Sequence, residues 1–121
     1  MAEHNIIGKT GEEAAVRYLL SKNYLIRHRN WHSGKRDLDI IAEKAGELVI
    51  VEVKTRTDDL FGNPEEAVDE KKIRHIIEST DAYIQMYEID KPVRFDVISV
   101  TGEKPPFRIE HIPEAFYPPL W

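Results

Sequence analysis

The chain contains no cysteine, and none of its hydrophobic runs is long. Without cysteine, disulfide bonds and thiolate zinc sites are excluded. No stretch approaches the roughly 20 apolar residues that a membrane-spanning helix needs. The first residues also lack the basic region and apolar run of a secretory signal. We therefore expect a cytoplasmic protein that does not bind membranes.

The hydrophobic fraction is moderate for a globular protein. At 41% of 121 residues, it is enough for one domain with a real core, and the length leaves no room for a second domain. We expect residues 1–121 to form a single domain.

Acidic residues are absent between Ala14 and Arg36, although the whole chain is acidic with a net charge of −5. The remainder of the chain carries −11, because this segment contributes six positive charges, from Arg17, Lys22, Arg27, Arg29, Lys35 and Arg36. A basic segment beside an acidic pocket is typical of a protein that grips a phosphate backbone. A solvated basic surface is the alternative explanation.

The spacing of apolar residues predicts alternating helical and extended segments. A first helix is expected over about Asn5 to Asn23, and a second from Asn63, as N-cap, to about Tyr87. Strands are expected at residues 24–31, 37–41, 49–54, 93–100 and 107–112, the last at a sheet edge. This order predicts an α/β fold: a mixed central sheet of four to five strands flanked by helices. The crossover through the second helix should make the fourth strand parallel to one of the first three.

Charged residues interrupt two of these strands. If Ala45-Gly46 is a two-residue turn, Lys44 pairs with Glu47, and the same count sets Asp39 opposite Glu52. It also sets Asp37 opposite Lys54, with Asp37, Asp39 and Ile41 on one face of their strand. Two carboxylates about 4 Å apart repel by about 4 kcal/mol at a protein-like dielectric constant. A divalent cation would remove this repulsion.

The cluster matches the needs of metal-assisted phosphodiester hydrolysis. Asp39 and Glu52, with the carbonyl of Val53, would give the oxygen ligands that Mg²⁺ prefers. Lys54 would orient or deprotonate the attacking water, or offset charge in the transition state. On the first helix, Glu12 lies on the side that faces the sheet, where it would join the acids.

Structural explanations remain open for the same residues. The acid cluster could be an Asp37–Lys54 salt bridge with Asp39 and Glu52 pointing to solvent. Glu12 could be an acid favoured by the dipole at the start of its helix.

A set of short motifs spread over nearly the whole chain carries a family resemblance: Gly11-Glu12, Ala15, Tyr18-Leu19, Arg29-Asn30, Asp37-x-Asp39, Glu52-Val53-Lys54-Thr55-Arg56, Gly62-x-Pro64, Glu66-Ala67-Val68, Lys72 and Phe95-Asp96-Val97. In this order they resemble the YraN-like family of predicted endonucleases. That family belongs to the PD-(D/E)xK nuclease superfamily and is described as similar to archaeal Holliday junction resolvases. The resemblance implies a restriction-endonuclease-like fold, a divalent metal, branched DNA as substrate and a homodimer.

The resemblance implies a site made of Glu12, Asp39, Glu52 and Lys54. Two departures concern its neighbours, because residue 37 is Asp where the family has Glu, and Arg36 replaces a Gly. The Gln-x-x-x-Tyr motif of related nucleases is absent, since the residue at the matching distance from Gln85 is Ile89.

These observations predict a DNA endonuclease that depends on Mg²⁺ or Mn²⁺. Phosphate contacts are expected from Arg27, Arg29, Lys35, Arg36, Arg56 and Lys72, with Leu25, Arg27 and Arg29 on one face of the first strand. Two other functions are weighed against it. One is a DNA-binding or assembly module that keeps the fold without cleaving, and the other is an interaction domain with a structural ion-pair cluster.

Overall fold

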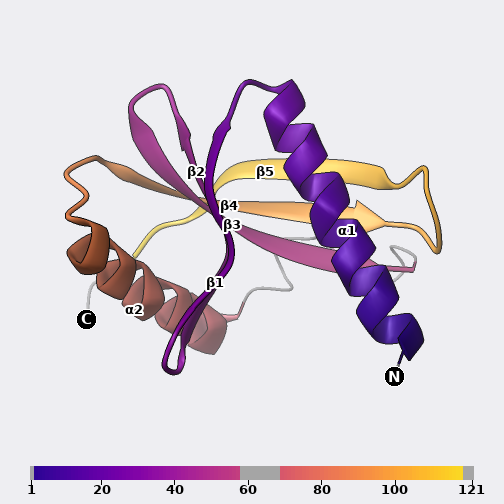
Figure 1. Cartoon of the computed structure of the whole chain (residues 1–121), viewed down its shortest axis with the longest axis horizontal. Coiled ribbons are helices and arrows are strands. Elements are labelled where there is room, and N and C mark those ends of the chain that lie inside the picture. The colour runs from indigo at the N-terminus through magenta and orange to yellow at the C-terminus, as the bar shows by residue number, and fades with distance from the viewer. Residues whose placement is uncertain (1, 58–68, 119–121) are drawn as a thin grey trace.

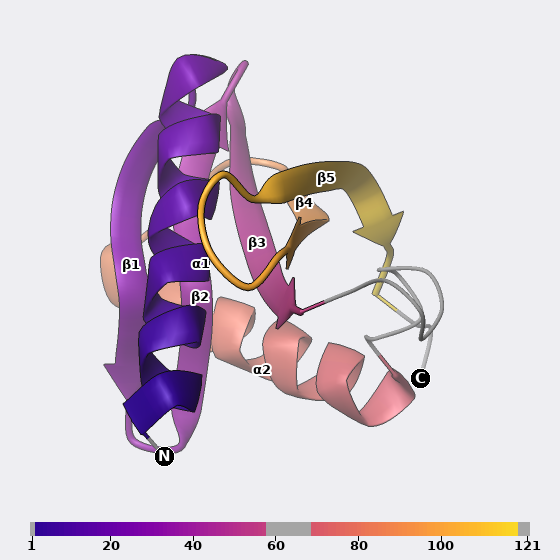
Figure 2. The same ribbon diagram turned by 90° about the vertical axis from the view of Figure 1, so that its right-hand side faces the viewer.

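The computed structural model describes residues 2–57 and 69–118 of the chain. In this part, a five-stranded sheet lies between two helices (Figures 1 and 2). The elements are α1 Ala2–Ser21, β1 Leu25–Ser33, β2 Arg36–Lys44, β3 Glu47–Arg56, α2 Glu70–Tyr87, β4 Val93–Thr101 and β5 Arg108–Phe116. This confirms the predicted order of elements. Neither described helix is long and apolar enough to cross a membrane.

The strands follow one another across the sheet in the order β1-β2-β3-β4-β5. Strand β3 pairs with β4 in parallel, after the crossover through α2, and the other neighbours are antiparallel. Ala45 and Gly46 have φ values of 51° and 81°, as a type I′ hairpin requires. Lys44 pairs with Glu47 as predicted, and the β2–β3 ladder continues to Ile40 and Val51.

Side chains alternate along β3 between two apolar clusters. The cluster under α2 contains the buried residues Trp31, Leu38, Ile41, Leu48, Ile50, Ile76, Tyr83, Phe95 and Val97. The cluster under α1 contains Ala15, Val16, Leu19, Ile40, Ala42, Val49, Val51, Ile98 and Val100. Because Leu48 and Ile50 face α2, Glu52 and Lys54 continue the same face. The two charged residues therefore follow the core directly along the strand.

Helix α1 approaches β3 closely at Gly11. A Cβ atom at this position would overlap the side chain of Thr55 and would lie 3.6 Å from Cγ1 of Val100. Glycine is therefore required by the contact between helix and strand. The next residue, Glu12, is held close to the sheet by the same contact.

Two expectations differ from the structure, and a third falls on residues that it does not describe. The predicted start of the second helix at Asn63 lies outside the described residues, and the described helix begins after Asp69, its N-cap. The prediction that side chains alternate strictly between the two faces along β1 was wrong, because the register shifts between Ile26 and His28. It was also wrong in β2, because Leu38 and Ile41 both lie in the cluster under α2. A bulge such as the one in β1 rotates the following side chains to the other face.

A buried carboxylate joins β4 to β5. Asp96 is fully buried and accepts two hydrogen bonds from Arg94, each of 2.9 Å. His111 lies 2.7 Å from the same carboxylate, and the backbone N–H of Glu114 donates to it at 3.1 Å. Burial alone would raise the pKa of Asp96, but His111, Arg94 and this N–H together lower it. The charge is therefore stabilised by its partners on the edge strand.

Candidate active site

The predicted acids gather where β2 and β3 separate. The backbone ladder ends at Ile40 and Val51, and just beyond it the N–H of Val53 donates to Oδ2 of Asp39 at 2.9 Å. A side chain thus replaces the backbone acceptor that β2 no longer supplies. In an extended strand the N–H and C=O of one residue point to the same side, so the carbonyl of Val53 faces the same gap.

Glu52 is the most deeply buried acid of this group. It is 6% exposed, and the pKa of its carboxyl is raised to about 7, first by burial and then by the negative charge of Asp39. The Nζ atom of Lys72, on α2, lies 3.1 Å from Oε1 of Glu52 and partly opposes this rise. An arrangement in which Glu52 points to solvent is therefore excluded, so the simple surface salt bridge does not describe this cluster.

Glu12 joins the group from α1. Burial raises the pKa of its carboxyl, Asp39 raises it further, and the positive charge of Arg29 acts in the opposite direction. Asp39 is thus a cause of the raised pKa of both Glu12 and Glu52. The fold brings three of the four predicted site residues, from α1, β2 and β3, into one electrostatic cluster.

Lys54 lies in an adjoining open hollow of about 450 Å³. The hollow is lined by Asp37, Lys54, Asp69, Lys71, Lys72 and His75. Asp37 and Lys54 share it, but the structure pairs Oδ1 of Asp37 with Nε2 of His75 at 2.7 Å. Lys72 lines the hollow and also contacts Glu52, so it joins the two parts of the site.

His75 and Lys71 line the hollow but were not predicted as site residues. Lys72, His75 and Ser79 follow one another at the spacing of one helix face, and the hydroxyl of Ser79 accepts a 3.3 Å hydrogen bond from the backbone N–H of Asp37. Polar residues at this spacing beside apolar Ile76 would have been the available signal. These contacts place the stripe against the end of β2, while the side chains of Lys72 and His75 stay 38% and 35% exposed.

The predicted phosphate contacts do not all meet at this hollow. Arg27 donates to Tyr83 and Glu43, at 2.9 Å each, and Arg36 donates to Glu78 at 2.6 Å. Arg29 acts electrostatically on Glu12, Lys35 lies exposed in the β1–β2 turn, and Arg56 ends β3. Of the six candidates, Lys72 is the one that lines the hollow.

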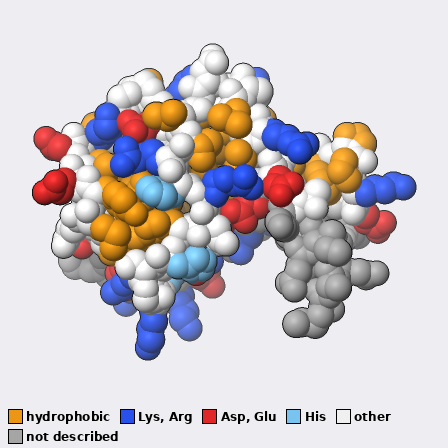
Figure 3. Space-filling view, viewed as in Figure 1, with side chains coloured by type: hydrophobic (Ala, Val, Ile, Leu, Met, Phe, Trp, Pro, Cys, Tyr) orange, Lys and Arg blue, Asp and Glu red, His pale blue; other side chains and the backbone are white. Residues whose placement is uncertain are grey.

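The surface beside α1 mixes both signs of charge. Figure 3 shows acidic and basic side chains next to each other across the middle of this face, and hydrophobic side chains gathered toward the C-terminal end of α2. Met86 and Tyr87, near that end, are 53% and 36% exposed. The basic segment therefore does not form an unbroken positive patch on this face.

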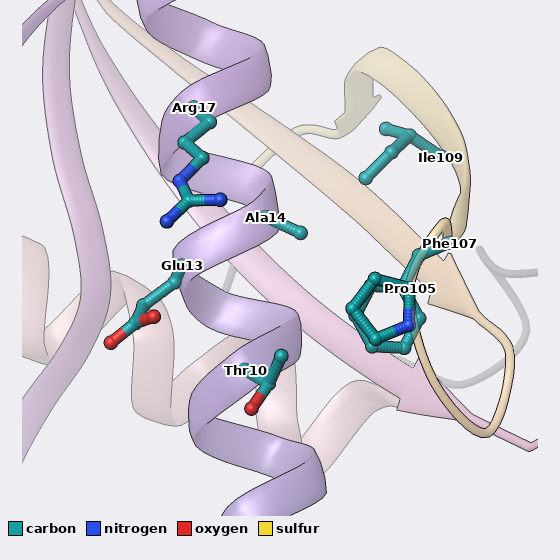
Figure 4. Close-up of a pocket in the computed structure, with 7 residues that line it drawn as sticks. All are labelled: Thr10, Glu13, Ala14, Arg17, Pro105, Phe107 and Ile109. Atoms are coloured by element: carbon teal, nitrogen blue, oxygen red, sulfur yellow. The ribbon is translucent and has the colours of Figure 1, made fainter.

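A second hollow, of about 300 Å³, lies between α1 and the β4–β5 connection. Figure 4 shows Pro105 and Phe107 facing the helix at Ala14, with Glu13 and Arg17 pointing away from the two rings. None of the predicted catalytic residues lines it. The chemistry of the candidate site is confined to the cluster around Asp39 and its adjoining hollow.

The donor set around Asp39 and Glu52 fits a hard divalent cation. Two carboxylates whose charges repel, beside a carbonyl at the same strand edge, are oxygen donors of the kind that Mg²⁺ and Mn²⁺ bind. In the described ranges, no group of three or more His, Asp or Glu side chains is gathered as a metal site. A cation here would need water and substrate oxygens to complete its ligands, which is common for Mg²⁺.

Comparison with known proteins places the site in a sequence context. Residues 11–100, which include the four predicted catalytic positions, match the model of "Uncharacterised protein family UPF0102". The chain is 64% identical over 121 residues to a UPF0102 protein of Phocaeicola vulgatus, and 61% identical over 121 residues to one of Bacteroides thetaiotaomicron, with 100% of every chain covered. A UPF0102 protein of Porphyromonas gingivalis is 52% identical over 118 residues, which are 96% of this chain and 87% of that relative.

Proposed function

The chain belongs to the UPF0102 family, the YraN-like family that its motifs resemble, and we propose that this member is a cytoplasmic, divalent-metal-dependent DNA endonuclease. The proposal includes a restriction-endonuclease-like fold of the PD-(D/E)xK superfamily. The mixed sheet with a helix on each face, and with acids at the point where two antiparallel strands separate, supports it.

One observation carries the proposal: Glu52 is almost fully buried next to a second carboxylate. Placing a charge at such a position costs several kcal/mol of stability unless a partner compensates it. A purely structural carboxylate would be expected to have a lowered pKa, as Asp96 has, and the pKa of Glu52 is raised instead. Glu52 is joined to the open hollow through its contact with Lys72, and a strongly perturbed carboxyl beside such a hollow is typical of functional sites.

Each residue of the cluster has a distinct role in this proposal. Asp39 and Glu52, with the carbonyl of Val53, would hold Mg²⁺ or Mn²⁺. When bound, the cation supplies Lewis-acid polarisation of the phosphoryl oxygen and lowers the pKa of water. Lys54 orients the attacking water or stabilises the negative charge that develops on the phosphate. Glu12 contributes a carboxylate that can accept a proton, and it lies near Asp39 on the side of α1.

The hollow supplies the contacts for the DNA backbone. Lys54, Lys71, Lys72 and His75 line it, and carboxylates of Asp37 and Asp69 limit its positive charge. The hollow is open to solvent, so a DNA strand can bring a phosphate group to the end of β3. Branched DNA, such as a four-way junction, and a homodimeric enzyme are the substrate and assembly that the family resemblance favours.

The pairing of the site residues favours one alternative, a DNA-binding module that does not cleave. Asp39 already accepts the N–H of Val53, and Glu52 already contacts Lys72, so both acids have partners without a cation. A cluster satisfied in this way could serve stability alone, with the basic residues of the hollow binding DNA.

A cleavage assay separates these functions. Linear, single-stranded, flapped and four-way-junction DNA would be incubated with the protein and Mg²⁺ or Mn²⁺, beside Glu52→Gln and Lys54→Met. The matched controls are Glu103→Gln and Lys104→Met, two exposed residues of the β4–β5 connection. Metal-dependent nicking that is lost in the site variants and kept in the controls is expected. DNA binding without nicking in any metal would replace the endonuclease by the module, and absence of DNA binding at low salt would refute both.

A further inference from the structure

Among the described residues, Lys72 is the cation that forms an ion pair with Glu52. Its Nζ lies 3.1 Å from Oε1 of Glu52. Burial lowers the pKa of this ammonium, but the carboxylates of Glu52, Asp39 and Asp37 outweigh burial, and its pKa is raised. The ammonium thus responds to all three acids at the end of the sheet. Lys54 belongs to the same Glu52-Val53-Lys54 motif as Glu52. Among the described residues, however, no ion pair includes Lys54.

The backbone of Lys72 is fixed by the helix cap, while its side chain is partly exposed. The side chain of Asp69 caps α2 by accepting the N–H of Lys72 at 2.8 Å. By contrast, the side chain of Lys72 is 38% exposed while that of Glu52 is 8% exposed. Lysine has a long, flexible stem with rotatable donors. With its backbone fixed, the ammonium can reach either the acids or the open hollow that it also lines.

Lys72 and a divalent cation at Glu52 would be close neighbours. The Nζ atom of Lys72 lies 3.1 Å from Oε1 of Glu52, an oxygen that the cation would also use. Like charges about 4 Å apart repel by about 4 kcal/mol per unit charge pair near a protein surface, so each cation weakens the binding of the other. Lysine and metal therefore compete for the same carboxylates.

We propose that Lys72 is a displaceable counter-ion, which neutralises Glu52 when no divalent cation is bound and is released into the hollow, toward a substrate phosphate, when the cation binds. This inference rests on the proposed function, because it needs a metal at Asp39 and Glu52. It couples the two events: in the metal-free protein the lysine is withheld from DNA, and metal loading frees it for phosphate contact.

The first test measures Mn²⁺ affinity without DNA, by calorimetry. Lys72→Met removes the charge and keeps the length of the side chain, and Lys71→Met removes a charge from the same hollow without contact to Glu52. Lys72→Met is expected to bind Mn²⁺ about tenfold more tightly than the native chain, because the cation no longer displaces an ammonium. Lys71→Met should bind within about twofold of the native chain. Equal affinities for Lys72→Met and Lys71→Met would overturn the inference.

The second test uses the native chain, so it does not depend on a variant folding. Lysines would be acetylated briefly by an N-hydroxysuccinimide ester with and without Mn²⁺, and each site quantified by peptide mass spectrometry. Release from Glu52 should raise the labelling rate of Lys72 severalfold on addition of Mn²⁺, with Lys71 unchanged. A purely structural ion pair would keep Lys72 equally protected in both conditions, which would overturn the inference.

Failure of the inference and failure of the proposed function give different results. If the native chain binds Mn²⁺ and nicks DNA while Lys72 labelling stays constant, the inference alone is wrong. If neither the native chain nor Lys72→Met binds Mn²⁺, the metal-dependent function is wrong and the inference fails with it. Mn²⁺ binding seen in Lys72→Met and undetected in the native chain would support the inference in its strongest form.

Discussion

Replacing Glu52 by glutamine should stabilise the protein above neutral pH. The pKa of this carboxyl is about 7 in the folded chain against an ordinary value of 4.5. At about 1.36 kcal/mol for each pKa unit, ionised Glu52 costs the folded state about 3 kcal/mol. Glutamine has nearly the same shape and carries no charge, so it avoids this cost. Because Glu52 is 6% exposed, solvent does not screen the effect.

The sign of the pH dependence follows from proton binding. Between about pH 4.5 and about pH 7, the folded chain holds a proton on Glu52 that the unfolded chain has released. The free energy of unfolding of the native chain therefore falls as the pH rises through this window. Glu52→Gln lacks this titration, so the difference between the two proteins should grow from near zero at about pH 4 to about 3 kcal/mol at about pH 8.

Urea denaturation at several pH values, without divalent cations, measures this difference. Glu103→Gln is the matched control, because it makes the same exchange at an exposed position. Its stability should follow that of the native chain at every pH. A cation bound at Asp39 and Glu52 should also restore part of the stability of the native chain at high pH, and should leave Glu52→Gln unchanged.

Two results would refute the reasoning. A difference between the native chain and Glu52→Gln that does not vary with pH would mean that Glu52 does not titrate in the predicted window. Destabilisation by Glu52→Gln at pH 8 would mean that the contact with Lys72 outweighs burial and the repulsion from Asp39.

Three other substitutions test the scaffold that holds the site, each by urea denaturation. Asp96→Asn should cost about 3 kcal/mol, because it leaves the buried arginine and histidine partners without a charge, whereas exposed Asp90→Asn should cost little; equal effects would contradict the buried network. Gly11→Ala should cost about 1–3 kcal/mol through overlap with Thr55, and adding Thr55→Ser should recover part of it; no recovery would place the strain elsewhere. Asp69→Ala should cost about 1 kcal/mol by removing the cap of α2, and unchanged stability would show that the cap is dispensable.

Local sequence patterns were sufficient for much of the fold. Ala45 and Gly46 supply the two positive φ values of a tight turn, so the register of β2 against β3 followed by counting. Apolar alternation in β3 placed Glu52 and Lys54 on a face that continues the core. These features depend on neighbours within a few residues, and the chemistry of each residue type decides them.

The irregular backbone of β1 has no signal in the apolar pattern of the sequence. The bulge after Ile26 and the positive φ of Asn30 break the alternation in β1, so Arg27 meets Tyr83 of α2 while Arg29 acts on Glu12 of α1. Nothing in a period-2 pattern signals such a break. Arg27 and Arg29, which were expected on one face of the first strand, therefore act on residues of different helices.

The sequence by itself determined which acids and lysines stand at the ends of which elements, because periodicity and turn chemistry are local. Only the tertiary structure decided their partners: Lys72 for Glu52, His75 for Asp37 and the N–H of Val53 for Asp39. The physical reason is that α2 lies far from β2 and β3 in sequence, and its packing angle on the sheet sets which of its polar side chains reaches the acids. Burial, which raises the pKa of Glu52, is likewise a property of the assembled layers and not of any single segment.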